Sequence, residues 1–210
     1  MSSKLSIYNT ALGYCRQRKI ADLSESSESR RIMDTYWTDV VAYCLEQGFW
    51  KFAMKTQQIY SNDGYTAPFG FTFQFDIPSD LAKLRSVSAS DRFDPPLLDI
   101  RDEAGCWYAD VEPIYVSFVS NANDYGNDIS LWSVTFADYV ASRLAAQAAP
   151  RLTGAEQLVD GLEKREKAAR IRAKANDAMN DPPGFAPTGR WVRSRRGLWP
   201  ADKARSSLIG

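Results

Sequence analysis

The sequence predicts an α+β protein: a helical bundle with an inserted small antiparallel β subdomain and an extended C-terminal arm. Apolar residues recur with helical spacing before residue 57 and after residue 125, whereas period-two alternation lies between these limits. Beyond residue 180 aliphatic residues become rare and no periodicity remains. The expected division is therefore a bundle from residues 1–56 and 126–180, a β subdomain at 57–125 and an arm at 181–210.

Two helical patterns open the chain. In the first, expected over residues 5–19, four apolar side chains share one face: Leu5, Tyr8, Leu12 and Cys15. The second is expected to begin at an N-cap on Asp22, or on the competing Ser24, and to stop at Gly48. Its apolar stripe has the 3.6-residue period and consists of Met33, Trp37, Val40, Val41, Cys44 and Leu45.

Alternating apolar and polar residues predict the first strand, over residues 69–77, which Pro78 ends. Its apolar members are Phe69, Phe71, Phe73, Phe75 and Ile77. Further short strands are expected at 84–89, 97–101, 106–111 and 113–119, with a hairpin turn at 102–105. They predict one small antiparallel sheet. The phenylalanine run is read as its buried face, and an exposed interaction edge is the alternative.

Helical periodicity returns after the polar loop 121–128. A helix from about Leu131 is expected to stop at Pro150, because proline lacks the N–H that an α-helix needs. Thr153-Gly-Ala-Glu156 forms a capping box for a last helix, which runs to about Met179.

From Glu163 that last helix is rich in Lys, Arg, Glu and Ala, and its apolar stripe thins. Its distal turns are therefore expected to be solvated or to meet a partner. Opposite charges four residues apart, Glu163 with Lys167 and Glu166 with Arg170, are expected to support it.

Composition excludes several classes of enzyme. The chain has no histidine, which excludes Ser-His-Asp and Cys-His mechanisms and zinc sites that need imidazole. Cys15, Cys44 and Cys106 are widely and irregularly spaced, so they are expected to be reduced thiols. Glycine-rich phosphate loops are absent from the sequence. No cofactor, no metal and no catalytic residue is expected.

The start of the chain does not resemble a signal peptide, and no apolar stretch approaches the length of a membrane span. No membrane partner is expected, and synthesis in a reducing cytoplasm is the prediction.

Two polar clusters have alternative interpretations. Asp99, Asp102 and Glu103 would suit a carboxylate hydrolase only if they faced each other across a cleft. Their place beside an expected hairpin turn favours solvated acids. Asn121, Asp124, Asn127 and Asp128 could suit calcium, but the spacing of an EF-hand loop is absent, which favours a polar loop and a helix cap.

The C-terminal arm combines basic and aromatic residues. We single out six of them as candidate interaction residues: Arg190, Trp191, Arg193, Arg195, Arg196 and Trp199. Arginine binds carboxylates in a forked geometry and tryptophan anchors interfaces, so a docking arm that orders on a partner protein or a neighbouring subunit is the first interpretation. A solvated tail and contact with DNA phosphates are the alternatives.

Several blocks of the chain resemble the tail tubular protein A family of tailed bacteriophages. The clearest are Leu5-Ser-Ile-Tyr-Asn-Thr-Ala-Leu12, Arg30-Arg-Ile-Met-Asp34-Thr-Tyr-Trp37 and Tyr43-Cys-Leu-Glu-Gln-Gly48-Phe-Trp50-Lys-Phe-Ala53. Phe75-Asp-Ile-Pro-Ser-Asp80 and the alanine-rich stretch 136–149 followed by Leu152-Thr-Gly are also similar. The resemblance covers roughly residues 5–175, and the arm is similar less specifically.

This resemblance implies a structural connector, or adaptor, between head and tail. Its subunits would form a ring, expected to be dodecameric, between the portal protein and a tail nozzle protein of the tail tubular B kind. The ring would surround passing genomic DNA without reading its sequence, in the neck of a virion assembled in the host cytoplasm. A DNA-binding module acting through the basic tail is the alternative, and a hydrolase using Asp99 or Asp102 is a third hypothesis.

Overall fold

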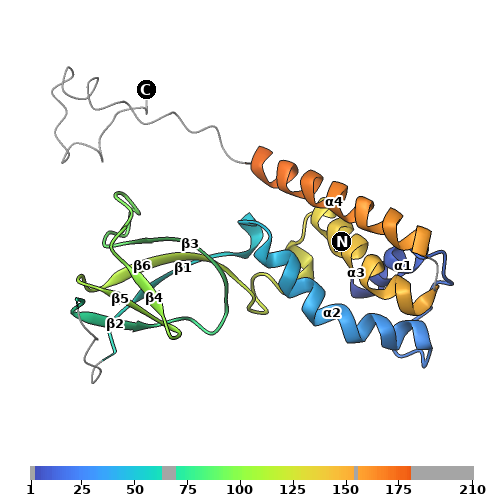
Figure 1. The fold of residues 1–210 in the computed structure, drawn as a ribbon, viewed down its shortest axis with the longest axis horizontal. Helices are drawn as coiled ribbons and strands as arrows, with labels where there is room; N and C mark the ends of the chain where they lie inside the picture. Colours follow the sequence, from blue (N-terminus) through green and yellow to red (C-terminus); the bar gives the residue numbers. More distant parts are fainter. Residues whose placement is uncertain (1–2, 63–69, 154–155, 181–210) are drawn as a thin grey trace, which may run out of the picture. The chain divides into compact units, whose positions relative to one another are not determined.

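The computed structural model describes residues 3–62, 70–153 and 156–180 (Figure 1). Within these ranges the chain forms four α-helices and two three-stranded antiparallel sheets, which confirms a mixed α+β protein. All of them belong to one compact unit, Met1–Ala178.

Helix α1, Lys4–Tyr14, is capped by the Ser3 hydroxyl, which accepts a hydrogen bond from the Ser6 amide at 3.2 Å. The prediction that this helix continues to residue 19 was wrong. Arg16 has a φ of 57°, and this left-handed residue ends the helix and redirects the chain.

Helix α2, Glu28–Glu46, has Ser27 as its N-cap, and neither of the expected caps, Asp22 and Ser24, has this role. The Asp22 carboxylate accepts the Ser24 amide at 2.8 Å, and the Glu25 carboxylate accepts the Ala21 amide at 2.9 Å. These short-range hydrogen bonds form a separate turn. The two acidic residues have the spacing of a capping box, but they accept backbone amides of their own loop instead.

The end of α2 is set by an aromatic side chain. The helix stops at Glu46, and a Cβ on Gly48 would lie 2.9 Å from the Trp50 ring. Glycine is therefore required here by close packing. A short 3-10 helix, η1 (Lys51–Ala53), then leads into the first strand.

The β region contains two sheets where one was expected. Sheet order β1-β6-β3 joins Met54–Ile59, Ile114–Ser120 and Leu81–Ser88, and order β2-β5-β4 joins Phe73–Asp76, Cys106–Ala109 and Arg101–Glu103. Strand β1 was not predicted, and the β region starts at Met54, three residues before the expected boundary at 57. The sequence Met-Lys-Thr-Gln-Gln-Ile hides this strand because three consecutive central residues are polar and exposed.

The phenylalanine run contributes to the β core. Phe75 is fully buried beside Trp107 and Phe118, with Phe73 and Ile77 packed on the same cluster. Phe69 lies outside the described residues. The strand that was expected at 97–101 begins only at Arg101, and Leu97 and Leu98 lie in the loop before it.

A two-residue turn joins β4 to β5 within the predicted hairpin region. Ala104 and Gly105 have φ values of 54° and 80°, which is typical of a type I′ turn. Alanine is poorly suited to this conformation, since its Cβ approaches the following carbonyl oxygen.

Replacing Ala104 with asparagine is therefore expected to raise the unfolding free energy by about 1 kcal/mol, because asparagine tolerates the left-handed region. Thermal denaturation of the A104N variant measures this. A89N, at another exposed loop alanine, is the control. An A104N midpoint at or below that of A89N contradicts the prediction.

Helix α3, Val134–Leu152, is capped by Ser133 and follows the 3-10 turn η2, Ile129–Leu131. Leu131 thus precedes the helix that was expected to start there. Pro150 does not stop α3, which continues for two further residues. A proline in the last turn removes only one backbone hydrogen bond, and the Thr153 amide still reaches the Ala149 carbonyl at 2.9 Å.

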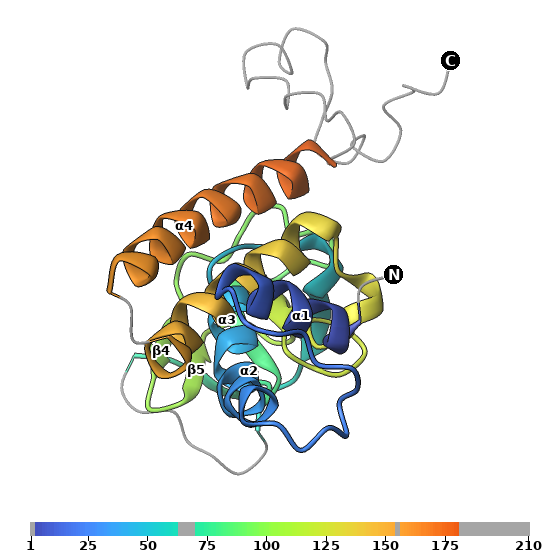
Figure 2. The ribbon, with the colours of Figure 1, turned by 90° about the vertical axis from the view of Figure 1, so that its right-hand side faces the viewer.

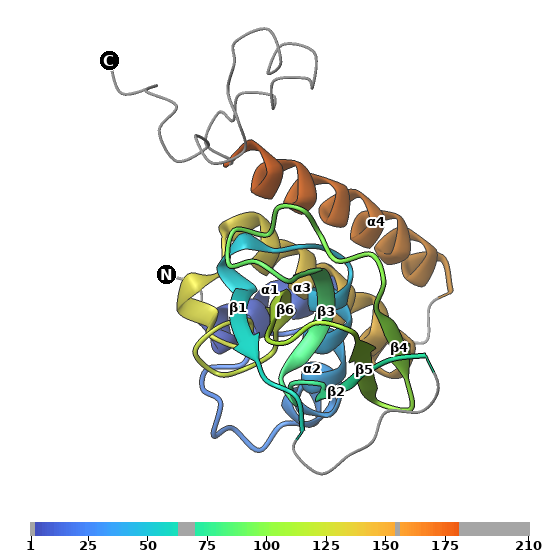
Figure 3. The same cartoon turned by 90° about the vertical axis from the view of Figure 1, so that its left-hand side faces the viewer.

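Helix α4, Glu156–Met179, lies along the outside of the other helices (Figure 2). The Thr153 hydroxyl donates to the Ala149 carbonyl at 3.0 Å, and residues 154–155 of the expected capping box lie outside the described residues. In Figure 3, which is viewed from the side of the sheets, the strands lie in front of helices α1, α2 and α3. Lys83 of β3 links the two regions by donating to the Glu46 carbonyl at 2.9 Å.

Candidate interaction surface

The six arm residues singled out from the sequence, Arg190, Trp191, Arg193, Arg195, Arg196 and Trp199, lie outside the described residues. The structure describes the helix that precedes them, α4, and the surface this helix presents.

One side of α4 is buried through a narrow seam. Its buried residues are spaced four, three and four apart: Leu162, Glu166, Ala169 and Ala173. Two alanines let the helix approach closely, but they bury little apolar area. Leu162 is the one large apolar side chain among these buried seam residues, and the half-buried Leu158 and Val159 pack on the same core beside it.

Ion pairs to α3 add to this seam. Asp138 lies 3.7 Å from an Arg165 nitrogen and 3.3 Å from an Arg172 nitrogen, and it accepts the Tyr14 hydroxyl at 2.5 Å. The Arg165 guanidinium also lies 3.6 Å from the centre of the Tyr14 ring. Burial and the hydrogen bond to Asp138 raise the pKa of Tyr14. The Asp138 carboxylate of α3 thus joins α3 to both α1 and α4.

A buried polar group lies beneath α4. Glu166 is 5% exposed and Arg143 faces the Tyr43 ring at 4.2 Å. Among the described residues, Glu166 Oε1 and Arg143 Nε are buried without a hydrogen-bond partner. Burial raises the pKa of the Cys44 thiol far above its usual value, and burial likewise raises that of Tyr139. A thiol held protonated in this way is not a nucleophile.

Three cations meet where α4 passes the end of α2. Arg170 donates to the Gln47 side chain at 3.3 Å, and Lys83 lies 4.9 Å from the centre of the exposed Phe49 ring. Burial and the positive charges of Arg170 and Lys83 lower the pKa of Lys174. Like charges held this close favour an anionic neighbour.

The outer side of α4 is exposed and has a net positive charge. Apart from Arg165 and Arg172, which pair with Asp138, the exposed charged side chains within 157–180 are the cations Lys164, Lys167 and Lys174 and the acids Asp160 and Glu163. Between the lysines lie small or apolar residues, of which Ile171 is 66% exposed. We call the exposed residues Lys164, Lys167, Ala168, Ile171, Lys174 and Ala175 the α4 row.

The expected pair of Glu166 with Arg170 in α4 is not what holds these two side chains. Among the described residues Glu166 is buried in the seam, and Arg170 bonds to Gln47. The sequence reads both as surface residues, because neighbouring charges hide which side of a charged helix is covered.

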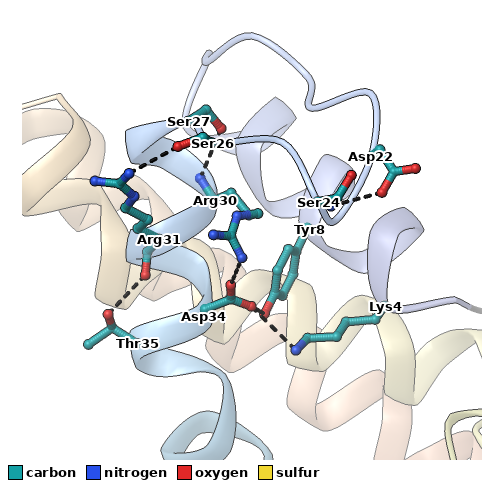
Figure 4. A network of polar contacts seen from close by, with 10 residues as sticks. All are labelled: Lys4, Tyr8, Asp22, Ser24, Ser26, Ser27, Arg30, Arg31, Asp34 and Thr35. Atoms are coloured by element: carbon teal, nitrogen blue, oxygen red, sulfur yellow. Dashed lines mark hydrogen bonds and ion pairs between the residues drawn. The ribbon is translucent and has the colours of Figure 1, made fainter.

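Two of the sequence blocks, residues 5–12 on α1 and residues 30–37 on α2, meet in one polar network (Figure 4). Asp34 of α2 accepts the Tyr8 hydroxyl at 2.7 Å and lies 3.3 Å from the Lys4 nitrogen and 2.6 Å from an Arg30 nitrogen. Burial raises the pKa of Asp34, but hydrogen bonds from Tyr8 and Lys4 and the charges of Lys4 and Arg30 outweigh it, so its pKa lies below the usual value.

The third block is anchored by Trp50. Its indole donates to the Cys44 carbonyl at 2.9 Å, and its ring lies 4.8 Å, centre to centre, from that of Phe136. Tyr8 and Asp34 therefore join α1 to α2, and Trp50 joins α2 to α3.

The acids considered as catalytic do not form a cleft. Asp99 and Asp102 are exposed, and Asp102 accepts the Trp107 indole at 3.2 Å. In the 121–128 loop, the Asp128 carboxylate caps η2 by accepting the Ser130 amide at 2.9 Å. Among the described residues no group of three or more His, Cys, Asp or Glu side chains is placed to hold a metal ion.

No helix in the described part of the chain is long and apolar enough to cross a membrane. No protein-family model matches the chain, and no curated protein matches it either.

Proposed function

We propose that this chain is the subunit of a head-to-tail connector of a tailed bacteriophage, located in the neck of the virion. The observation that carries the proposal is the resemblance over residues 5–175 to the tail tubular protein A family. Its blocks on α1 and α2 contact each other through Tyr8 and Asp34, as blocks with a shared structural role should. The protein acts by shape and contact, and no bond-breaking step is assigned to it.

The finer architecture belongs to the same proposal. The helices form a bundle that carries the β region as an insertion, and residues 181–210 form an arm that docks on the portal protein or a neighbouring subunit. The subunits close into a ring, expected to be dodecameric, which contacts the tail nozzle protein and surrounds the genome. In the proposed arm, arginines such as Arg190 would bind carboxylates of the partner, and tryptophans such as Trp191 would fill its pockets.

Electron microscopy of the full chain mixed with portal rings tests the connector proposal. We expect a ring stacked coaxially on the portal. A chain ending at residue 180 is expected to lose this attachment, because the arm supplies a large share of it.

Circular dichroism is the control for the truncated chain, since helices α1–α4 all end before residue 181 and should remain. Undiminished attachment of the truncated chain refutes the arm. A full chain that never stacks on portal rings, and is missing from the neck of particles, refutes the connector.

DNA binding is the second candidate, and three exposed lysines of α4, Lys164, Lys167 and Lys174, favour it. Phosphate contacts release counterions, so affinity for DNA would fall by roughly one decade per decade of salt for each contact. The formal net charge of zero favours the connector.

A further inference from the structure

We infer that the α4 row of one copy of this chain binds an exposed row on α2 of a second copy. The inference rests on the proposed ring, and it names the two surfaces that meet. Both surfaces are left exposed by the fold of a single copy, and their charges are opposite.

The α2 row consists of residues on the side of α2 that faces away from its buried stripe: Glu28, Arg31, Thr35, Thr38, Asp39, Ala42 and Glu46. They are exposed, except for the half-buried Ala42. Three acids against one arginine give this row a negative charge. Since the remaining members are Thr and Ala, a second helix can approach it closely.

The charges of the two rows are spaced alike. Lys167 and Lys174 lie seven residues apart on α4, and Asp39 and Glu46 lie seven residues apart on α2. Seven residues are two turns, or about 10 Å, so both lysines reach both carboxylates at once when the helices lie nearly parallel or antiparallel. A second α4 row would instead place lysine against lysine, which opposes symmetric pairing.

This register places the exposed Ile171 opposite Ala42, because each lies midway between its two charges. Ala42 lines a hollow of about 280 Å³, together with Trp37 and Trp132. The two indole rings are stacked with centres 6.0 Å apart. Ile171 would therefore leave water for a hollow lined on one side by the two indoles, Val41 and Ala42 and on the other by polar residues: Thr38, Asn121, Asn123 and Asn127.

Two different surfaces then meet at each contact. Such a heterologous contact repeats from copy to copy and closes into a ring when the rotation allows. In Figure 1 helices α2 and α4 flank α3 on different sides, so one copy can engage two neighbours at once. The inference thus gives the proposed ring its repeating contact.

Charge reversal tests the contact. K167E/K174E and D39K/E46K, each made in the full chain, should weaken self-association at least about tenfold in low salt, because like charges then face each other. Mixed in equal amounts, the two variants should regain wild-type association, since each reversed row meets its complement. Sedimentation velocity measures the association, and thermal melts check that each variant folds.

Matched controls reverse exposed charges in the β region. R85E/R92E and D91K/D99K should associate like the wild type. A carbodiimide, which joins amines directly to carboxylates, should link Lys167 or Lys174 to Asp39 or Glu46 between ¹⁵N-labelled and unlabelled copies.

Self-association that survives both reversals, a mixture that does not recover, or a wild-type chain without inter-copy links overturns the inference. A K167E/K174E variant that loses only affinity for a DNA oligonucleotide assigns the α4 row to DNA instead, and also overturns it. Rings on the portal are a separate measurement. If the variants still form them, the connector stands and this contact falls.

Discussion

Replacing Trp50 with alanine is expected to lower the free energy of unfolding by about 3–5 kcal/mol, the usual cost of removing a buried aromatic side chain. Trp50 is 1% exposed and lies among the rings of Phe52, Phe136 and Tyr139. Its loss leaves a cavity at the junction of α2 and α3 and leaves the Cys44 carbonyl without its donor. Thermal or urea denaturation measures the change.

The neighbouring aromatic residue supplies a matched control. Phe49 is 46% exposed, so F49A should cost far less than W50A. W50F keeps a ring but loses the indole hydrogen bond, and it should fall between the wild type and W50A. Equal losses for F49A and W50A would show that Trp50 is not the anchor described above.

Trp50 also illustrates what the sequence could predict. The end of α2 near Gly48 follows from the sequence, but its cause does not. A glycine after a helix commonly adopts a left-handed conformation, whereas Gly48 is required because the Trp50 ring lies against its Cα. Glycine is thus required at this boundary by the contact of the Trp50 ring with the Gly48 backbone, whereas the sequence pattern alone suggests a left-handed backbone conformation.

The same limit applies to the errors at other helix ends. Asp22 and Glu25 have the spacing of a capping box, yet both are used by amides within their own loop. Pro150 lies in the last turn of α3, where its missing N–H removes a single backbone hydrogen bond. The split into two sheets depends on which strands pair, and pairing over long distances is not encoded in the alternation of any one strand.

The candidate surface was only half predictable. The charged residues of the last helix predict a surface that is solvated or meets a partner. Which side of the helix is covered depends on Leu162 and the alanines at 169 and 173, and alanines are too common to mark a seam. The acidic row on α2 was not recognised, because its charges are separated by threonines and an alanine.

Replacing Asp34 with asparagine is the second large effect, expected to cost about 2 kcal/mol at pH 7. Asp34 holds a hydroxyl and two cations, and hydrogen bonds to a charged group contribute about 1.5–3 kcal/mol each, reduced here because the side chain is 34% exposed. Denaturation of D34N measures this. D124N, at an exposed carboxylate in the 121–128 loop, is the control and should stay near the wild type.

The cost of D34N is expected to depend on pH in one direction. The pKa of Asp34 is lower in the folded chain than its value of about 3.9 in the unfolded chain. The stabilisation is therefore fully present above about pH 4 and is lost as the pH falls through the folded pKa. The difference between wild type and D34N should be constant from pH 7 to 5 and should shrink below pH 4. A difference that persists unchanged at pH 2 would mean that packing, and not the charge of Asp34, joins α1 to α2.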